Sequence, residues 1–183
     1  MTEADIAMLL AGRDDLRALL ETVRDLDLPD CWIGAGMVRN AVWDHLHGVD
    51  PATRPASDVD VVYFDPADTD PARDAELEAT LKTVDGNIDW EVRNQARMHL
   101  RNGDRPYRDT EDALRFWPET ATAVAARLNG DRVQIIAPYG TSDLLGLIVR
   151  PTPPFRRKMD IFNARQAAKG WAQRWPKLTF AAI

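Results

Sequence analysis

The sequence predicts an α/β domain in which helices flank a mixed sheet of roughly four or five strands, followed by a helical C-terminal segment. Apolar residues at helical spacing, as in 3–25 and 37–47, alternate along the chain with short runs of strand-forming residues, as in 58–64. The chain has 183 residues, of which 45% are hydrophobic and 28% are charged. This composition is typical of a globular protein and is sufficient for one sizeable core.

The elements can be assigned in chain order. Gly12 interrupts the first helical pattern, so one long helix or two short ones are both consistent with residues 3–25. We expect strands at 31–33, 58–64, 88–93 and 133–137, helices at 37–47, 74–84, 111–127 and 155–171, and a helix or strand at 143–149 and a helix or loop at 94–100. Pro118 divides the helix expected at 111–127.

We expect a single domain over residues 1–183, with its core at 28–150 and a basic helical tail at 151–183 packed on that core. Trp171 and Trp175 are the expected anchors of this tail.

Charge is distributed unevenly along the chain. The formal net charge is -6, yet the chain from residue 150 onward holds eight Lys or Arg and one acidic residue, Asp160. Such a segment either attracts an anionic partner or complements the acidic body internally, and the sequence leaves both open.

We expect a cytoplasmic protein with no membrane partner. No apolar run is long enough to cross a bilayer, and the N-terminal residues lack the basic region of a signal peptide. The single cysteine, Cys31, excludes an internal disulfide framework and a multi-cysteine zinc site.

Acidic residues occur at two predicted strands. Asp58 and Asp60 begin one strand and, being two residues apart, share a face of it. Neighbouring carboxylates repel unless a cation lies between them, and Mg²⁺ prefers such oxygen ligands. Asp89 and Glu91 share a face of the next strand, and either could supply a third carboxylate, which would allow two metal ions. The alternative to a metal site is that these acidic residues lie at solvent-exposed strand ends and bind no ligand.

A turn of small residues, Gly34-Ala35-Gly36, lies between a predicted strand and a predicted helix. Backbone N–H groups at such a turn can bind phosphates. Arg39 and Asn40 follow in the first turns of the helix, where they either contact a nucleotide or serve the structure, with Arg39 paired to an aspartate.

A dense polar block follows the second acidic strand. Its members are Arg93, Asn94, Gln95, Arg97 and His99. Arginine is suited to phosphate recognition, but an internal hydrogen-bond network explains the block equally well.

Several of these motifs resemble a known superfamily. AGMVRN at 35–40, LHG at 46–48 and DVDV at 58–61 resemble the Gly-Gly-x-Val-Arg-Asp…Asp-x-Asp pattern of polymerase-β-type nucleotidyltransferases. WEVRNQARMH at 90–99 and the ending KGW…WPKL at 169–178 resemble further blocks of a bacterial nucleotidyltransferase-like branch. The likeness runs from about residue 28 to residue 178.

The resemblance implies roles for particular residues. In the superfamily the Asp-x-Asp pair and a third carboxylate bind metal and carry catalysis, which here implies Asp58, Asp60 and Glu91. Ala35 replaces the first glycine of the superfamily turn and Gly36 matches the second. The implied nucleotide-binding residues are Gly34, Ala35, Gly36, Arg39 and Asn40.

The resemblance also implies an activity. It is metal-dependent transfer of a nucleoside monophosphate from an NTP donor to an acceptor, with release of pyrophosphate. The cofactor would be Mg²⁺ or Mn²⁺, with two ions, and the acceptor a small molecule, RNA or protein. The alternative is a non-catalytic module that keeps the fold to sense a nucleotide or to bind a protein partner.

Overall fold

A computed structural model describes residues 1–53 and 58–181. Its main feature is a five-stranded mixed sheet in the order β3-β2-β1-β4-β5. The strands are β1 (Trp32–Gly34), β2 (Val59–Tyr63), β3 (Trp90–Asn94), β4 (Ala125–Asn129) and β5 (Arg132–Ile136). β2 and β3 are parallel and the other neighbours are antiparallel. The prediction of a mixed sheet flanked by helices is confirmed.

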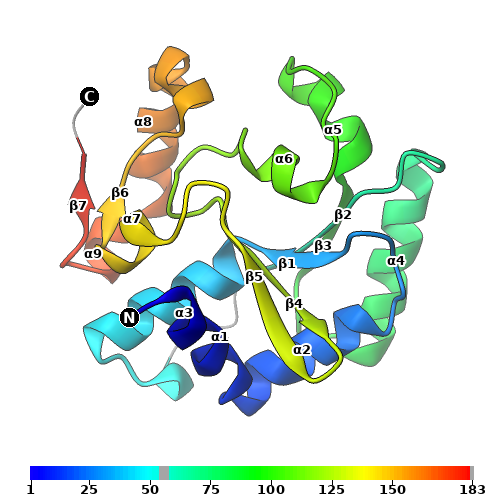
Figure 1. Cartoon of the computed structure of the whole chain (residues 1–183), viewed down its shortest axis with the longest axis horizontal. Helices are drawn as coiled ribbons and strands as arrows, with labels where there is room; N and C mark the ends of the chain where they lie inside the picture. Colours follow the sequence, from blue (N-terminus) through cyan, green and yellow to red (C-terminus); the bar gives the residue numbers. More distant parts are fainter. Residues whose placement is uncertain (54–57, 182–183) are drawn as a thin grey trace.

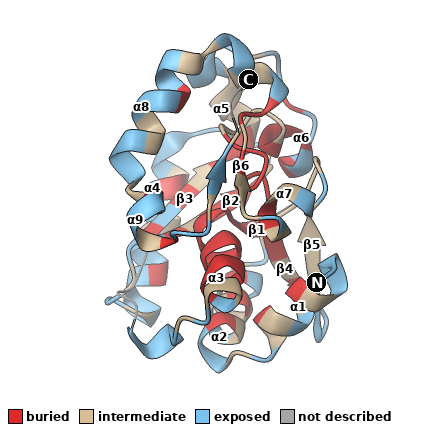
Figure 2. Ribbon diagram, turned by 90° about the vertical axis from the view of Figure 1, so that its left-hand side faces the viewer, coloured by how far each residue is buried: buried red, intermediate tan, exposed pale blue. Residues whose placement is uncertain are grey.

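The first four helices cover one face of this sheet; in Figure 1, α1, α2 and α3 lie below it and α4 stands beside β3 at the right. They are α1 (Glu3–Ala11), α2 (Asp14–Arg24), α3 (Gly36–His47) and α4 (Pro71–Val84). The first helical pattern is therefore two helices, separated at Gly12. The main hydrophobic core lies between these helices and the sheet, and α3 is buried along most of its length (Figure 2).

The opposite face of the sheet is covered only in part. In Figure 1, α5 (Gln95–Asn102), α6 (Thr110–Leu114) and α8 (Met159–Lys169) lie above it. Val59 and Val61 of β2 belong to the main core, whereas Val62 packs in a smaller cluster with Trp32 and Leu114. Asp60 alternates with the core valines, so its side chain lies on this second face.

The remaining elements form the C-terminal part of the molecule. They are α7 (Ser142–Leu145), β6 (Ile148–Val149), α9 (Trp171–Arg174) and β7 (Thr179–Phe180), with short 3₁₀ helices at Pro51–Thr53 and Pro153–Arg157. β6 and β7 pair in a separate parallel ribbon. The segment at 143–149 thus contains the end of a helix and a strand. Of the segment at 94–100, Asn94 ends β3 and the rest is helical. In the described part of the chain, no helix has the length and hydropathy needed to cross a membrane.

The helix predicted at 111–127 is wrong over most of its length. α6 ends at Leu114, turns follow, and β4 begins at Ala125. The alanine-rich run within 111–127 has a high intrinsic helix propensity. Pro118 interrupts the helix, and Ala125 pairs with Gly34 inside the sheet, where small side chains fit beneath Trp32. Tertiary packing overrides the local preference here.

The helix predicted at 155–171 is divided. A 3₁₀ turn precedes α8, and Gly170, with φ of +60°, separates α8 from α9.

Two tryptophans of the C-terminal segment contact α3. Trp171 and Trp175 are buried and make edge-to-face contacts with Trp43, at centroid distances of 5.5 and 5.1 Å. The indole N–H of Trp175 donates to Asp44 at 2.7 Å. Because aromatic pairs add stability beyond the area they bury, this cluster fixes the segment firmly to the body.

Candidate active site

Strand register brings two of the predicted carboxylates together. Asp60 of β2 is the register partner of Glu91 of β3, and paired residues in neighbouring strands direct their side chains to the same face. Asp58 lies two residues before Asp60, just ahead of β2, and is exposed. Asp60 and Glu91 lie on the face of the sheet opposite the first four helices, and Asp58 directly precedes β2.

Asp60 is in a strongly perturbing electrostatic environment on this face. Burial raises the pKa of Asp60 to about 6, and the negative charges of Asp58 and Glu91 act in the same direction. The positive charges of Arg39 and Lys169 oppose this shift. The carboxylates therefore lie close enough to repel one another, and the nearby cations do not offset the combined effect of burial and repulsion on the pKa of Asp60.

The carboxylates suit a hard divalent cation. Mg²⁺ commonly takes one or two protein carboxylates and completes its shell with water and substrate phosphates, and excess negative charge at Asp60 favours such an ion. Among residues 1–53 and 58–181, no three acidic, histidine or cysteine side chains are gathered closely enough to form a ready-made metal site. Glu91 has an exposed side chain, 48% accessible, which leaves it room to reorient.

Asp89, the other candidate for the third carboxylate, lies just before β3. Its carbonyl oxygen accepts a hydrogen bond from the Val59 N–H at 2.9 Å, and the residue is exposed. Since Glu91 is the direct partner of Asp60 and acts on its pKa, the geometry favours Glu91.

The small-residue turn is shaped by close contacts. A Cβ on Gly34 would lie 2.6 Å from the Trp117 ring, so this position requires glycine. Ala35 has φ of +30°, in the region that favours glycine, at the position where the superfamily pattern has one. Gly36 opens α3, whose first turn has no side-chain cap. The first N–H groups of a helix have no partner within the helix, and such groups bind phosphate at helix N-termini.

Arg39 is buried, and its guanidinium donates to the Asn40 side-chain oxygen at 2.9 and 3.2 Å. It lies over the ring of Trp171 at 4.5 Å and near that of Trp43 at 5.4 Å. Burial lowers the pKa of Arg39 to about 10, so it stays charged at neutral pH. In the described residues no aspartate forms an ion pair with it, and its contact with Trp171 joins α3 to the C-terminal segment.

Glu119 is a central residue that the sequence analysis missed. It is fully buried, and one carboxylate oxygen accepts from Arg165 at 2.9 Å and from Gln166 at 2.7 Å. The Thr122 hydroxyl donates to the other oxygen. The charge of Glu119 also supports the protonated form of Arg39. The only local signal was an acidic residue within a run of small residues, which a helix assignment explained equally well.

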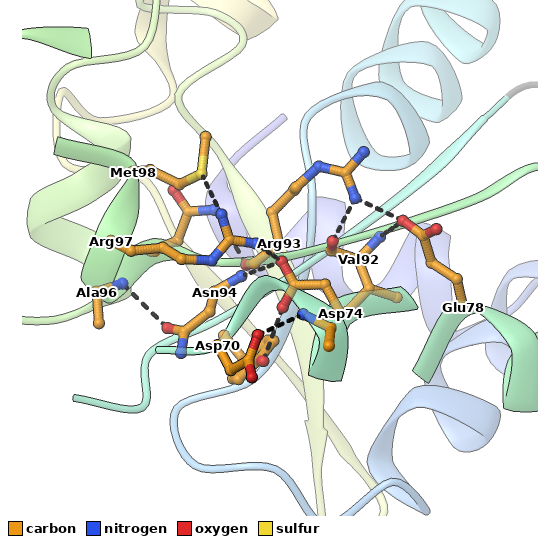
Figure 3. Close-up of polar contacts among 12 residues, drawn as sticks. Asp70, Asp74, Glu78, Val92, Arg93, Asn94, Ala96, Arg97 and Met98 are labelled. Atoms are coloured by element: carbon orange, nitrogen blue, oxygen red, sulfur yellow. Dashed lines mark hydrogen bonds and ion pairs between the residues drawn. The ribbon is translucent and has the colours of Figure 1, made fainter. Parts of the chain in front are cut away.

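The polar block after Val92 is mainly an internal network, shown in Figure 3. Buried Asp74 accepts hydrogen bonds from the Tyr63 hydroxyl at 2.8 Å and the Asn94 backbone N–H at 3.2 Å, and also pairs with Arg97. The Asn94 side chain caps α5 by accepting from the Ala96 N–H at 3.0 Å. These contacts agree with an internal hydrogen-bond network, the alternative to phosphate recognition, for Asn94 and Arg97.

Arg93, in the same block, is held beside the carboxylates. It donates to Glu78 at 2.5 Å, and its other terminal nitrogen lies 3.8 Å from Glu91.

A cavity of about 510 Å³ lies between α2, α3 and the start of β2. Its lining includes Asn40, Met37, Val59 and Trp90, and none of the three carboxylates. Val59 and Asp60 alternate along β2, so this cavity and the carboxylates lie on opposite faces of the strand. Of the predicted nucleotide-binding residues, only Asn40 lines it.

Comparisons with known proteins agree with this architecture. A family model described as nucleotidyltransferase matches residues 21–180. An NMR structure described as revealing a CCA-adding enzyme head domain is 34% identical, with a TM-score of 0.87, and the match covers 98% of this chain and 96% of that one. A search of curated proteins found no match.

More distant structures share the fold over only part of their length. The Thermotoga maritima CCA-adding enzyme complexed with tRNA is 16% identical, with a TM-score of 0.59, and a CCA-adding enzyme complex with CTP is 14% identical, with a TM-score of 0.60. Both matches cover 100% of this chain but only 43% and 44% of those chains. This chain therefore spans less than half the length of these enzymes.

The sheet and its helical cover define a nucleotidyltransferase fold of the polymerase-β type. The chain belongs to the nucleotidyltransferase family whose model matches residues 21–180.

Proposed function

We propose that this protein is a metal-dependent nucleotidyltransferase that transfers a nucleoside monophosphate from an NTP to an acceptor. The observation that carries the proposal is the pairing of Asp60 with Glu91 on the uncovered face, beside Asp58. Family membership supports nucleotidyl transfer as the type of reaction. CCA-adding enzymes have been solved with CTP and with ATP, which supports an NTP as the donor.

The reaction is a displacement at the α-phosphorus of the donor. An acceptor hydroxyl oxygen forms the new bond to this phosphorus, the bond to the bridging oxygen of the β-phosphate breaks, and pyrophosphate leaves. Mg²⁺ or Mn²⁺, held by Asp58, Asp60 and Glu91, would supply charge neutralisation at the attacking and leaving oxygens. Glu91 is exposed, and in this mechanism it would accept the proton of the acceptor hydroxyl. The first turn of α3, which has no side-chain cap, would offer its backbone N–H groups to the donor phosphates.

The acceptor stays open among a small molecule, RNA and protein. The second candidate function is a nucleotide-sensing or protein-binding module without turnover. One observation favours it: the described residues contain no preassembled three-ligand metal site. The two functions differ in turnover, and both require the same donor site.

The test is thermal unfolding with each NTP, with and without Mg²⁺ or Mn²⁺. The proteins are the wild type, Asp58→Asn/Asp60→Asn, and the control Asp131→Asn, whose side chain is 97% exposed. A ligand at about 100 times its Kd adds about 2.7 kcal/mol, or roughly 5–11 °C for a chain of this size. We expect a metal-dependent shift in the wild type and the control, and none in the double variant.

The outcomes of this experiment distinguish the two candidate functions. An equal shift in the double variant would place the donor elsewhere and refute the site. A shift without pyrophosphate release, whether with water, RNA or small hydroxyl compounds as acceptor, would favour the sensing module.

A further inference from the structure

Strand β5 is the last strand of the sheet, and its outer edge carries unpaired backbone groups. Asn129 and Arg132 are register partners on either side of the two-residue turn 130–131, so they form a hydrogen-bonded pair. Because bonded and non-bonded pairs alternate along an antiparallel ladder, the N–H and C=O groups of Val133 and Ile135 point away from β4. In the part of the chain that the structure describes, these groups form no hydrogen bond outside the ladder.

The opposite edge of the sheet, at β3, is protected. The backbone N–H of Val92 donates to a Glu78 carboxylate oxygen at 2.9 Å, and that of Asn94 donates to Asp74 at 3.2 Å. Both acceptors belong to α4, which therefore covers that edge. β5 contains no proline or lysine, and its one-to-one register with β4 contains no bulge, so the common devices that block edge pairing are missing from it.

An apolar surface of α1 lies beside this open edge, at the right of the molecule in Figure 2. Residues at helical spacing form one side of the helix, namely Ala4, Ala7, Met8 and Ala11. This side faces away from the core, since Ile6 and Leu10 are fully buried whereas Met8 is 63% exposed. An open groove of about 660 Å³ is lined by Ala4 and Ala7 of α1 and by residues 133–136 of β5. An exposed apolar surface beside an open strand edge is typical of a protein interface.

The shape of this surface favours a second copy of the chain as its partner. A partner has to supply a strand at the level of the sheet and an apolar surface at the level of α1. A lone extended peptide supplies only the strand, whereas a second copy supplies both with the same spacing. The outward-facing residues Val133 and Ile135 flank Gln134, so a two-fold axis at Gln134 pairs Val133 of each copy with Ile135 of the other. Such self-complementarity is the property of an isologous interface.

The charges are compatible with this axis. Residues near a two-fold axis meet their own counterparts, and Gln134, Ala4 and Ala7 are uncharged. Arg17 of α2 lies 3.8 Å from Asp131, so β5 begins near the junction of α1 and α2 and ends toward the start of α1. The charged residues Glu3 and Arg132 therefore lie toward opposite ends of the surface, and the rotation does not bring like charges together at the axis.

We propose that this protein self-associates through β5, with two copies joining their five-stranded sheets into one continuous sheet. The two β5 strands pair antiparallel with Gln134 on the two-fold axis, and the two α1 helices contact each other through their outer apolar sides. The inference is independent of the proposed transfer reaction, because β5 and the carboxylates of β2 and β3 lie toward opposite ends of the sheet.

A disulfide across the axis tests the register. Gln134 and its counterpart would form a non-hydrogen-bonded pair, whose Cβ atoms are about 4.5–5.5 Å apart and can be bridged. Gln134→Cys should therefore form a covalent dimer under mild oxidation. The control Asp131→Cys is at a position whose side chain is 97% exposed. It should cross-link about tenfold more slowly, because the two copies of this position are about 20 Å apart in the proposed register. The wild type, with Cys31 alone, gives the background.

Sedimentation equilibrium over a range of concentrations tests association without a cross-link. The average mass of the wild type should rise with concentration from that of one 20.6 kDa chain toward that of two. Val133→Pro removes an outward N–H, a change that edge strands tolerate, and Met8→Glu places two carboxylates between the α1 helices. Each variant should weaken association about tenfold or more, because each change acts twice in a symmetric dimer. Leu100→Glu introduces the same charge at a 76% exposed position of α5 and should associate like the wild type.

Urea unfolding provides the folding control, and Met8→Glu, at an exposed position, decides the question if Val133→Pro proves unstable. Three results would overturn the proposal. The first is a wild type that sediments as a monomer at every concentration. The second is cross-linking of Gln134→Cys no faster than that of Asp131→Cys. The third is association that neither Val133→Pro nor Met8→Glu weakens, which would place the contact on another surface.

Discussion

The buried pair of Glu119 and Arg165 offers a sharp test of how the C-terminal segment is held. Replacing Glu119 with glutamine keeps the shape of the side chain and removes its charge. Glu119 is fully buried, whereas the Arg165 side chain is 31% exposed and can regain part of its hydration. The loss therefore falls below the about 3–5 kcal/mol typical of breaking a fully buried pair.

We expect Glu119→Gln to lower the free energy of unfolding by about 1.5–3 kcal/mol, the usual value of hydrogen bonds to charged groups. For a chain of this size the unfolding temperature should fall by about 3–12 °C. Glu119→Ala also loses the bonds to Thr122 and Gln166 and leaves a cavity, so its cost should reach about 3–5 kcal/mol.

The assay is urea unfolding followed by tryptophan fluorescence, since Trp171 lies beside this pair, 5.8 Å from the Arg165 guanidinium. The matched control is Glu111→Gln, an exposed glutamate paired with Arg115 at 3.3 Å, which should change stability by less than about 0.5 kcal/mol. A Glu119→Gln variant no less stable than this control would refute the reasoning. In a double-mutant cycle with Arg165→Gln, the coupling energy should be about 1 kcal/mol or more.

Two further predictions concern backbone strain and acid stability. Ala35→Gly should leave the free energy of unfolding unchanged or raise it by up to about 1 kcal/mol, because it relieves a positive φ, whereas Ala41→Gly inside α3 should lower it by about 1 kcal/mol. Urea unfolding compares the two, and an equal loss would contradict the strain assigned to Ala35. Asp112 is buried, and its hydrogen bonds from Arg105 and Arg108 hold its pKa well below the usual range. A depressed pKa stabilises the fold above about pH 4, and this contribution is lost as the pH falls further. Asp112→Asn should therefore be less stable than wild type by about 1–3 kcal/mol at pH 7, and the difference should shrink toward pH 2. A difference that stays constant across this range would contradict the assignment.

The sequence by itself determined the features that depend on local geometry. The alternation in β2 places Asp60 on the face opposite Val59 and Val61, because strand side chains alternate with a period of two. The turn at Gly34-Ala35-Gly36 between a strand and a helix, and hence the order of the motifs, follows from the same kind of local pattern.

Tertiary structure alone decided which distant groups meet. Glu119 and Arg165 are 46 residues apart, and no local pattern connects them. The alanine-rich run became β4 because a small-residue strand fits the sheet beside β1, although its propensity is helical. Arg39 came to lie over the Trp171 ring because the C-terminal segment packs on α3. Helical and strand periods are set within a few residues, whereas the partner of a buried charge is chosen by the packing of the whole chain.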